Sequence, residues 1–233
     1  MIALSSELSR RAAEQAIENG DVTLNDEVVT KLGTLVNVHT DIVKLKGTKL
    51  IISSKRRYLA YNKPRCMMVT KSDPEGRSTI WDDLKDFKKS LNTVGRLDFD
   101  SEGLILLSDD GDFINKLTHP RHEIWKTYRV WVRGKPSNED LAKLKNGVSI
   151  QGGKTLPAKL KVHSREDNNS LLEISIREGK NRQVRRMFEA VGFTVRSLKR
   201  ISIGPVKLGR LTTGKWRELS PDEVKSLISL SKI

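Results

Sequence analysis

The sequence predicts an α+β protein, in which a small helix-plus-strands domain precedes a larger domain with a largely antiparallel mixed sheet. Three observations support this fold class. Short β-branched runs outnumber helical segments, they follow one another at hairpin-like spacings, and the chain has no regular βαβ repeat or nucleotide-binding glycine pattern. With 233 residues, the chain is long enough for one or two domains.

The first element expected is a short helix within residues 5–20. Ser9 suits the N-cap, and Gly20 suits the position after the last turn. Between them, Ala13 and Ile17 lie four residues apart and therefore share one face of the helix. The segment predicts a helix with a basic start.

Four strand-like runs follow this helix, and turn residues separate them. They are VTLN, EVV, DIVKL and KLIIS. The basic stretch SKRR at 54–57 then precedes an apolar run, which is typical of a domain boundary. We therefore expect a domain at residues 1–54 and a second at residues 55–233.

The second domain alternates strand-like segments with a few helical ones. The strand-like segments are YLAYNKP, GLILLS, YRVWVRG, PAKLKVHS and LLEISI, and helices are expected over 110–118, 137–146 and 181–191. Ser137 with the acids after it suits a helix N-terminus, and Gly147 suits its end.

The composition favours nucleic acid as the partner. The 43 Lys and Arg residues exceed the 29 acids and give a net charge of +14, which attracts a polyanion. No apolar run approaches the ~20 residues of a membrane span, and no signal-peptide pattern is present, so we expect a soluble cytoplasmic protein. One cysteine and four scattered histidines predict no disulfide and no metal site.

Positive charge is concentrated between Arg177 and Arg210, a segment that contains ten Lys or Arg residues and only two acids. Such a run is most often a solvated surface. Here the basic residues are interspersed with the apolar positions of a predicted helix and a predicted strand. A rigid surface would therefore present them, as in a phosphate-binding site.

Three motifs in order resemble the ribosomal-RNA pseudouridine synthases of the RsuA/RluB group. They are GRLDFDSEGLILLSDDGD, KTYRVWV and EGKNRQVRRM. The stretch SRRAAEQAIENGDVTLND resembles the alpha-L RNA-binding motif that precedes the catalytic domain in this group, here without part of its first helix. The usual Thr of the first motif is Ser101, which keeps the hydroxyl group.

The resemblance implies isomerisation of a uridine and gives roles to three residues. Asp98 is the catalytic carboxylate, which acts as a nucleophile at ribose C1′ or as a base at C2′. Arg185 is its cationic partner, because a carboxylate beside a neutral base otherwise loses its charge on burial. Tyr128 stacks on the uracil and helps to remove the C5 proton. Without the resemblance, Asp98 reads as a turn residue and Tyr128 as a core aromatic.

Further residues are expected to bind the RNA substrate. Leu198 either lines the uracil pocket or belongs to the core, and Arg96 is either structural or contacts RNA. Gly95 and Gly103 allow the backbone to present Asp98 from a loop, which the buried run after Gly103 anchors. The complete set of expected substrate-binding residues is Arg96, Lys126, Lys180, Arg182, Arg186, Leu198 and Arg200.

We therefore expect a monomeric enzyme that needs no cofactor or metal and modifies ribosomal RNA or a ribosomal-subunit assembly intermediate, with large-subunit RNA favoured over small-subunit RNA. Two other classes remain open. One is a noncatalytic RNA-binding or ribosome-assembly protein. The other is a glycosidase-like hydrolase that uses Asp98 with Asp100 or Glu102.

Overall fold

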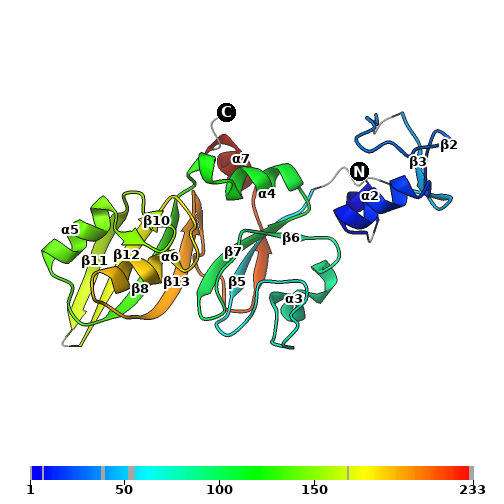
Figure 1. Ribbon diagram of the computed structural model, residues 1–233. Helices are drawn as coiled ribbons and strands as arrows, with labels where there is room; N and C mark the ends of the chain where they lie inside the picture. Colours follow the sequence, from blue (N-terminus) through cyan, green and yellow to red (C-terminus); the bar gives the residue numbers. More distant parts are fainter. Residues whose placement is uncertain (1, 7, 38–39, 52–55, 167, 231–233) are drawn as a thin grey trace. The chain divides into compact units, whose positions relative to one another are not determined.

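The computed structural model describes residues 2–6, 8–37, 40–51, 56–166 and 168–230 (Figure 1). The chain forms two compact units, residues 1–56 and residues 57–233. The boundary expected after residue 54 falls outside the described residues. Within the part of the chain that the structure describes, no helix is long and apolar enough to cross a membrane.

The first unit pairs two short helices with a four-stranded antiparallel sheet. The helices are α1 (Ile2–Ser5) and α2 (Arg10–Glu18), and the strand order is β2 (Glu27–Val28), β1 (Val22–Leu24), β3 (Val43–Leu45) and β4 (Thr48–Lys49). The Ser9 N-cap is confirmed, because its hydroxyl accepts a hydrogen bond from the Ala12 amide at 3.1 Å. Of the strand expected over KLIIS at residues 49–53, β4 includes only Lys49; Leu50 is buried, Ile51 is 78% exposed, and residues 52 and 53 lie outside the described residues.

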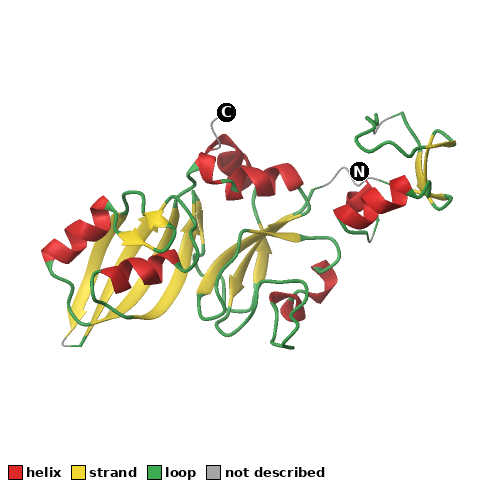
Figure 2. Ribbon diagram, in the orientation of Figure 1, coloured by secondary structure: helices red, strands yellow, loops and turns green. Residues whose placement is uncertain are grey.

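A nine-stranded mixed sheet forms the second unit (Figure 2). Its main path is β11 (Lys159–Glu166), β12 (Asn169–Ile176), β8 (Lys126–Arg133), β13 (Val195–Ile203), β7 (Glu102–Ser108), β5 (Tyr58–Lys63) and β15 (Trp216–Glu218), while β14 (Val206–Lys207) pairs with β13 and β6 (Asn92–Val94) pairs with β7. Only the β13–β7 pair among these strands is parallel, which confirms the largely antiparallel sheet. A separate hairpin consists of β9 (Ser149–Ile150) and β10 (Gly153–Lys154).

The centre of this sheet is buried on both faces. Residues 104–107 of β7 have no exposed surface, as their apolar sequence predicts, and alternate residues enter two different apolar clusters. Helices α4 (Gly111–Thr118) and α7 (Pro221–Leu230) pack on one cluster. Helices α3 (Ile80–Asp83), α5 (Asn138–Asn146) and α6 (Gln183–Ala190) pack on the other.

The expected helices over 110–118, 137–146 and 181–191 correspond to α4, α5 and α6. Helix α6 begins only at Gln183, because Arg182 takes a left-handed conformation. Helices α3 and α7 and two 3₁₀ turns, η1 (Lys85–Phe87) and η2 (Pro120–His122), were not predicted. The signal for α7 is present in the sequence, since Pro221 opens its first turn and the hydroxyl of Ser220 accepts a hydrogen bond from the Glu223 amide.

The parallel pair β13–β7 depends on a glycine. Arg200 of β13 is in register with Gly103, whose φ is 103°. A Cβ atom at Gly103 would lie 2.3 Å from the carbonyl oxygen of Arg200, so no larger residue fits at this distance. The expected need for glycine at position 103 is confirmed. It has two causes, the positive φ of this residue and the close approach of the two strands.

Candidate active site

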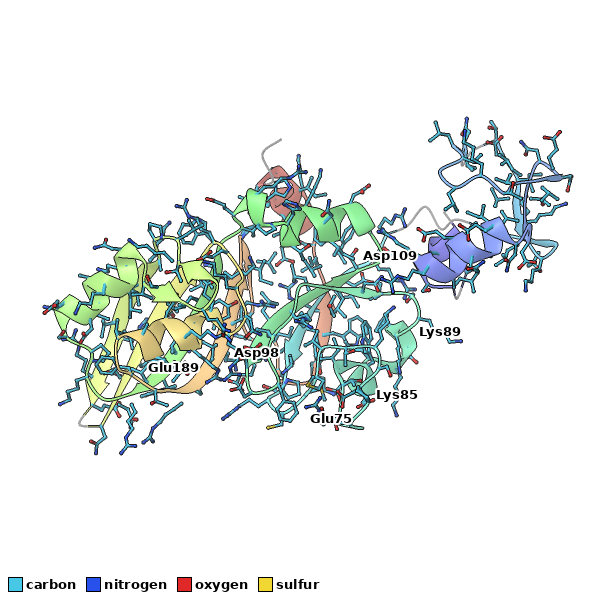
Figure 3. The ribbon with its side chains drawn as sticks, viewed as in Figure 1. Glu75, Lys85, Lys89, Asp98, Asp109 and Glu189 are labelled. Atoms are coloured by element: carbon cyan, nitrogen blue, oxygen red, sulfur yellow. The ribbon has the colours of Figure 1, made fainter. Side chains whose placement is uncertain are left out.

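One cavity of about 360 Å³ brings together most of the residues that the sequence singled out. Its walls are the segment 94–98, the segment from the end of α4 into β8, and residues 176–184, and its floor comes from β8 and β13. Figure 3 shows Asp98 in the region between β7 and α6. Eight of the ten expected site residues line this cavity, namely Arg96, Asp98, Lys126, Tyr128, Lys180, Arg182, Leu198 and Arg200.

Asp98 lies on the loop between β6 and β7 and is partly buried. Among the described residues, no side chain pairs or hydrogen-bonds with its carboxylate. Its carbonyl oxygen instead accepts hydrogen bonds from the Ser101 amide at 3.1 Å and from the Lys63 ammonium at 3.2 Å. The backbone of this loop is therefore held in place while the carboxylate lies at the cavity.

Lys63 holds this loop in place, and its position in a strand-like run is the only sign of it in the sequence. Its side chain is fully buried, and its Nζ atom also donates to the carbonyl oxygens of Pro64, Phe99 and Ser101 at 3.0, 3.4 and 2.8 Å. Burial lowers the pKa of Lys63 to about 8, although the charges of Asp100 and Asp98 act in the opposite direction. The buried ammonium group of Lys63 thus stabilises the four carbonyl groups that point toward it.

Two residues of β8 and three of β13 line the cavity floor, namely Lys126, Tyr128, Leu198, Arg200 and Ile203. Tyr128 is 8% exposed and Leu198 is 5% exposed, and both belong to the apolar core as well as to the cavity lining. Lys126 shares the inner face of β8 with Tyr128, two residues away. Arg200 is paired with Tyr128 in the sheet and is 3% exposed. The floor therefore combines an apolar part with two cations.

The expected ion pair between Asp98 and Arg185 is not present. Arg185 is buried on α6, and its Nη2 atom lies 3.1 Å from Oδ2 of Asp100. The same guanidinium donates to the carbonyl oxygens of Asp100 and Val195, both at 3.1 Å. Burial lowers the pKa of Arg185, and the charge of Asp98 contributes to raising it, so Asp98 lies nearby without direct contact. Asp100 takes the place that we expected for Asp98, because its carboxylate faces the start of α6.

The other expected basic residues differ in what their charges contact. Arg182 binds both carboxylate oxygens of Asp100 at 3.2 Å. Lys180 donates to the carbonyl oxygens of Gly153 and Lys154 in the β9–β10 hairpin, at 3.2 and 2.7 Å, so its ammonium fastens this hairpin to the cavity wall. Arg186 does not line the cavity.

The arrangement does not suit a pair of catalytic carboxylates built on Asp98 with Asp100 or Glu102. Neither Asp100 nor Glu102 lines the cavity. Asp100 is engaged by two arginines, and Glu102 lies 3.6 Å from the ammonium of Lys199. The cavity instead offers Asp98 beside an aromatic ring, an apolar surface and several cations, which suits a neutral base attached to a charged backbone.

Protein-family models match both parts of the chain. Residues 57–190 match the family model described as RNA pseudouridylate synthase, and residues 3–42 match the S4 domain. The chain is 43% identical to ribosomal large subunit pseudouridine synthase B of Bacillus subtilis over 233 residues, which cover 99% of this chain and 95% of that protein. It is 41% identical over 220 residues to an uncharacterized RNA pseudouridine synthase of Aquifex aeolicus, covering 94% and 88% of the two chains. A solved pseudouridylate synthase with 31% identity superposes with a TM-score of 0.68, over 97% of this chain and 96% of the other.

Proposed function

The chain belongs to the RNA pseudouridylate synthase family, and from this premise we propose that it isomerises a uridine of large-subunit ribosomal RNA with Asp98 as the catalytic carboxylate. The observation that carries the role of Asp98 is its position at the cavity beside Tyr128 and Leu198. The choice of RNA rests on the name of the Bacillus subtilis relative. The S4 domain and the net charge of +14 support an RNA partner.

The reaction requires one carboxylate at the sugar. The bond between uracil N1 and ribose C1′ breaks, a bond between C5 and C1′ forms, C5 loses its proton, and N1 gains one. Substrate and product are isomers, so no redox step is involved. Asp98 either attacks C1′ or removes the C2′ proton, and in both cases the uracil stays in the site until it is rejoined.

Tyr128 and Leu198 are proposed to hold the uracil while it turns. A flipped base needs a surface to replace the stacking that it loses, and an aromatic ring with an apolar neighbour provides one. The Tyr128 hydroxyl group is the proposed acceptor for the C5 proton in the last step. This role follows from its place on the cavity floor, opposite Arg200 in the sheet.

Arg185 is proposed to act through the loop that carries Asp98. It binds both the carboxylate and the carbonyl group of Asp100, and Arg182 binds the same carboxylate from the surface. Two arginines therefore fasten the loop to α6 two residues after Asp98. Arg182, Arg96 and Lys126 line the cavity and are proposed to contact the RNA backbone.

The remaining expectations are part of the same proposal. The enzyme acts without cofactor or metal, as a monomer in the cytoplasm, on ribosomal RNA or on a ribosomal-subunit assembly intermediate. The domain at residues 1–54 holds the RNA, and residues 55–233 carry out the chemistry.

Tritium release tests the proposal directly. Unmodified large-subunit rRNA is transcribed with C5-tritiated uridine and treated with wild type, with Asp98→Asn and with Asp86→Asn. Asp86 is an exposed acid on η1 and serves as the matched control. Binding of the transcript is measured in parallel, so that all three proteins are compared at equal occupancy.

We expect release with wild type and Asp86→Asn, with the base retained in the RNA, and none with Asp98→Asn. Equal release with Asp98→Asn would exclude this residue as the catalytic group. Release only from a small-subunit transcript would correct the substrate. Binding without release from either transcript would favour the noncatalytic RNA-binding protein.

A further inference from the structure

Arg200 lines the cavity and carries one side-chain donor without a hydrogen-bond partner among the described residues. Its Nε atom donates to the carbonyl oxygen of Leu104 at 2.7 Å, and Nη1 donates to that of Arg96 at 3.4 Å. The Nη2 atom is buried and has no hydrogen-bond partner within the described part of the chain. A buried guanidinium nitrogen without a partner is costly, because it has lost its water without a replacement.

Lys126 brings a second positive charge to the same place. Its Nζ atom donates to the Ile124 carbonyl oxygen at 3.1 Å, and in the described residues no carboxylate pairs with it. Burial, together with the positive charge of Arg200, lowers the pKa of Lys126 to about 8. Arg200 is in register with Tyr128, and Lys126 lies two residues from Tyr128 on the same strand, so the two cations are neighbours in the sheet. Glu123, which also lines the cavity, is paired with Arg177 at 2.9 Å and does not neutralise them.

The position of these cations points to the ligand. Lys126 lies two residues from Tyr128 on one face of β8, which is about 6.6 Å along the strand. A uracil held against Tyr128 and Leu198 carries its own ribose and phosphates with it. One of these phosphates would supply an anion where the cavity has two unneutralised cations and a free donor.

We propose that Lys126 and Arg200 form a binding site for one backbone phosphate of the RNA, adjacent to the uridine at Asp98. This inference rests on the proposed function, because it takes the base at Tyr128 to be the target. The phosphate accepts hydrogen bonds from Nζ of Lys126 and Nη2 of Arg200. It fixes the register of the strand so that the ribose, rather than a neighbouring nucleotide, lies at Asp98.

A combination of altered RNA and altered protein tests the site. Short rRNA fragments that contain the mapped uridine are made with a single uncharged methylphosphonate, either 5′ or 3′ of that nucleotide. Their affinities are measured for wild type, Lys126→Met and Lys145→Met. Lys145 is an exposed lysine on α5 outside the cavity, so its variant has the same net charge as Lys126→Met.

We expect one of the two methylphosphonates to weaken binding by wild type and Lys145→Met about tenfold or more, as for loss of a charge-assisted hydrogen bond. With Lys126→Met the same methylphosphonate should weaken binding clearly less, because only Arg200 then remains to contact the phosphate. If either methylphosphonate weakened RNA binding equally in all three proteins, the phosphate site would be overturned. Tritium release by wild type would still support the proposed function.

Inorganic phosphate provides a test that does not need the substrate. Its ³¹P resonance should broaden more with wild type and Lys145→Met than with Lys126→Met at the same protein concentration. Equal broadening by the three proteins would overturn the site. Absence of tritium release from any rRNA would by contrast count against the proposed function alone, so the two failures can be told apart.

Discussion

The guanidinium group of Arg185 contacts Asp100 twice, at 3.1 Å from its Oδ2 atom and at 3.1 Å from its carbonyl oxygen. Arg182 binds the same carboxylate at 3.2 Å. Burial alone would raise the pKa of Asp100, but hydrogen bonds from Arg182 and the charges of both arginines lower it. Asp100 therefore stays ionised and fastens the Asp98 loop to α6.

Replacement of Asp100 should weaken this fastening. Asp100→Asn leaves Arg185 buried without its anion, so we expect the free energy of unfolding to fall by about 1–3 kcal/mol. Urea denaturation measures this change. Glu139→Gln is the control, since it removes an exposed ion pair with Lys143 and should cost less than about 0.5 kcal/mol. Equal losses in the two variants would show that the Asp100 contacts do not stabilise the fold.

Gly103 should not tolerate a side chain. In Gly103→Ala the new Cβ atom meets the Arg200 carbonyl oxygen at 2.3 Å, and the backbone conformation is itself unfavourable for alanine. We expect a loss of about 3 kcal/mol or more of unfolding free energy, or failure to fold. Gly209→Ala has a positive φ but open space around it, so it should lose only about 1 kcal/mol. Similar melting temperatures for the two variants would contradict a role for the close strand approach.

Replacement of Lys63 should lower the rate of the reaction more than it lowers the affinity for RNA. Lys63→Met removes the ammonium group that binds four carbonyl oxygens, including that of Asp98, so the carboxylate is no longer held in position. We expect kcat to fall about tenfold or more, in line with a misplaced catalytic group. The RNA dissociation constant should change less than about twofold. Single-turnover tritium release and filter binding separate the two quantities, with circular dichroism to verify folding. An unchanged kcat would exclude Lys63 as a positioning residue.

RNA affinity should depend on pH through Lys126. Its pKa in the free protein is about 8, and a bound phosphate raises it, because an anion favours the charged form. Below pH 8 the lysine is protonated in both states, so its contribution to affinity is constant. Above pH 8 binding must take up a proton, and affinity should fall by up to about tenfold per pH unit. Lys126→Arg stays charged and should lack this fall, which titrations from pH 6.5 to 9.5 would reveal.

Eight of the ten site residues that the sequence predicted line the cavity. Asp98, Tyr128 and Leu198 come from segments that lie far apart along the chain, and all three line the cavity. The reason is that the apolar run at 104–107 and the alternating pattern of β8 fix their faces in the sheet. Local signals also placed the helix caps, since Ser9 and Ser137 accept hydrogen bonds from amides of the first helical turn.

By itself the sequence determined the fold class, the family and most of the residues at the cavity, because these depend on local periodicity and on motifs of fixed spacing. Only the tertiary structure decided which charges pair. Arg185 meets Asp100 instead of Asp98, Lys180 holds a hairpin, and Lys63 donates hydrogen bonds to the loop that carries Asp98. These contacts depend on ångström-scale distances between segments up to 85 residues apart, which no local pattern specifies.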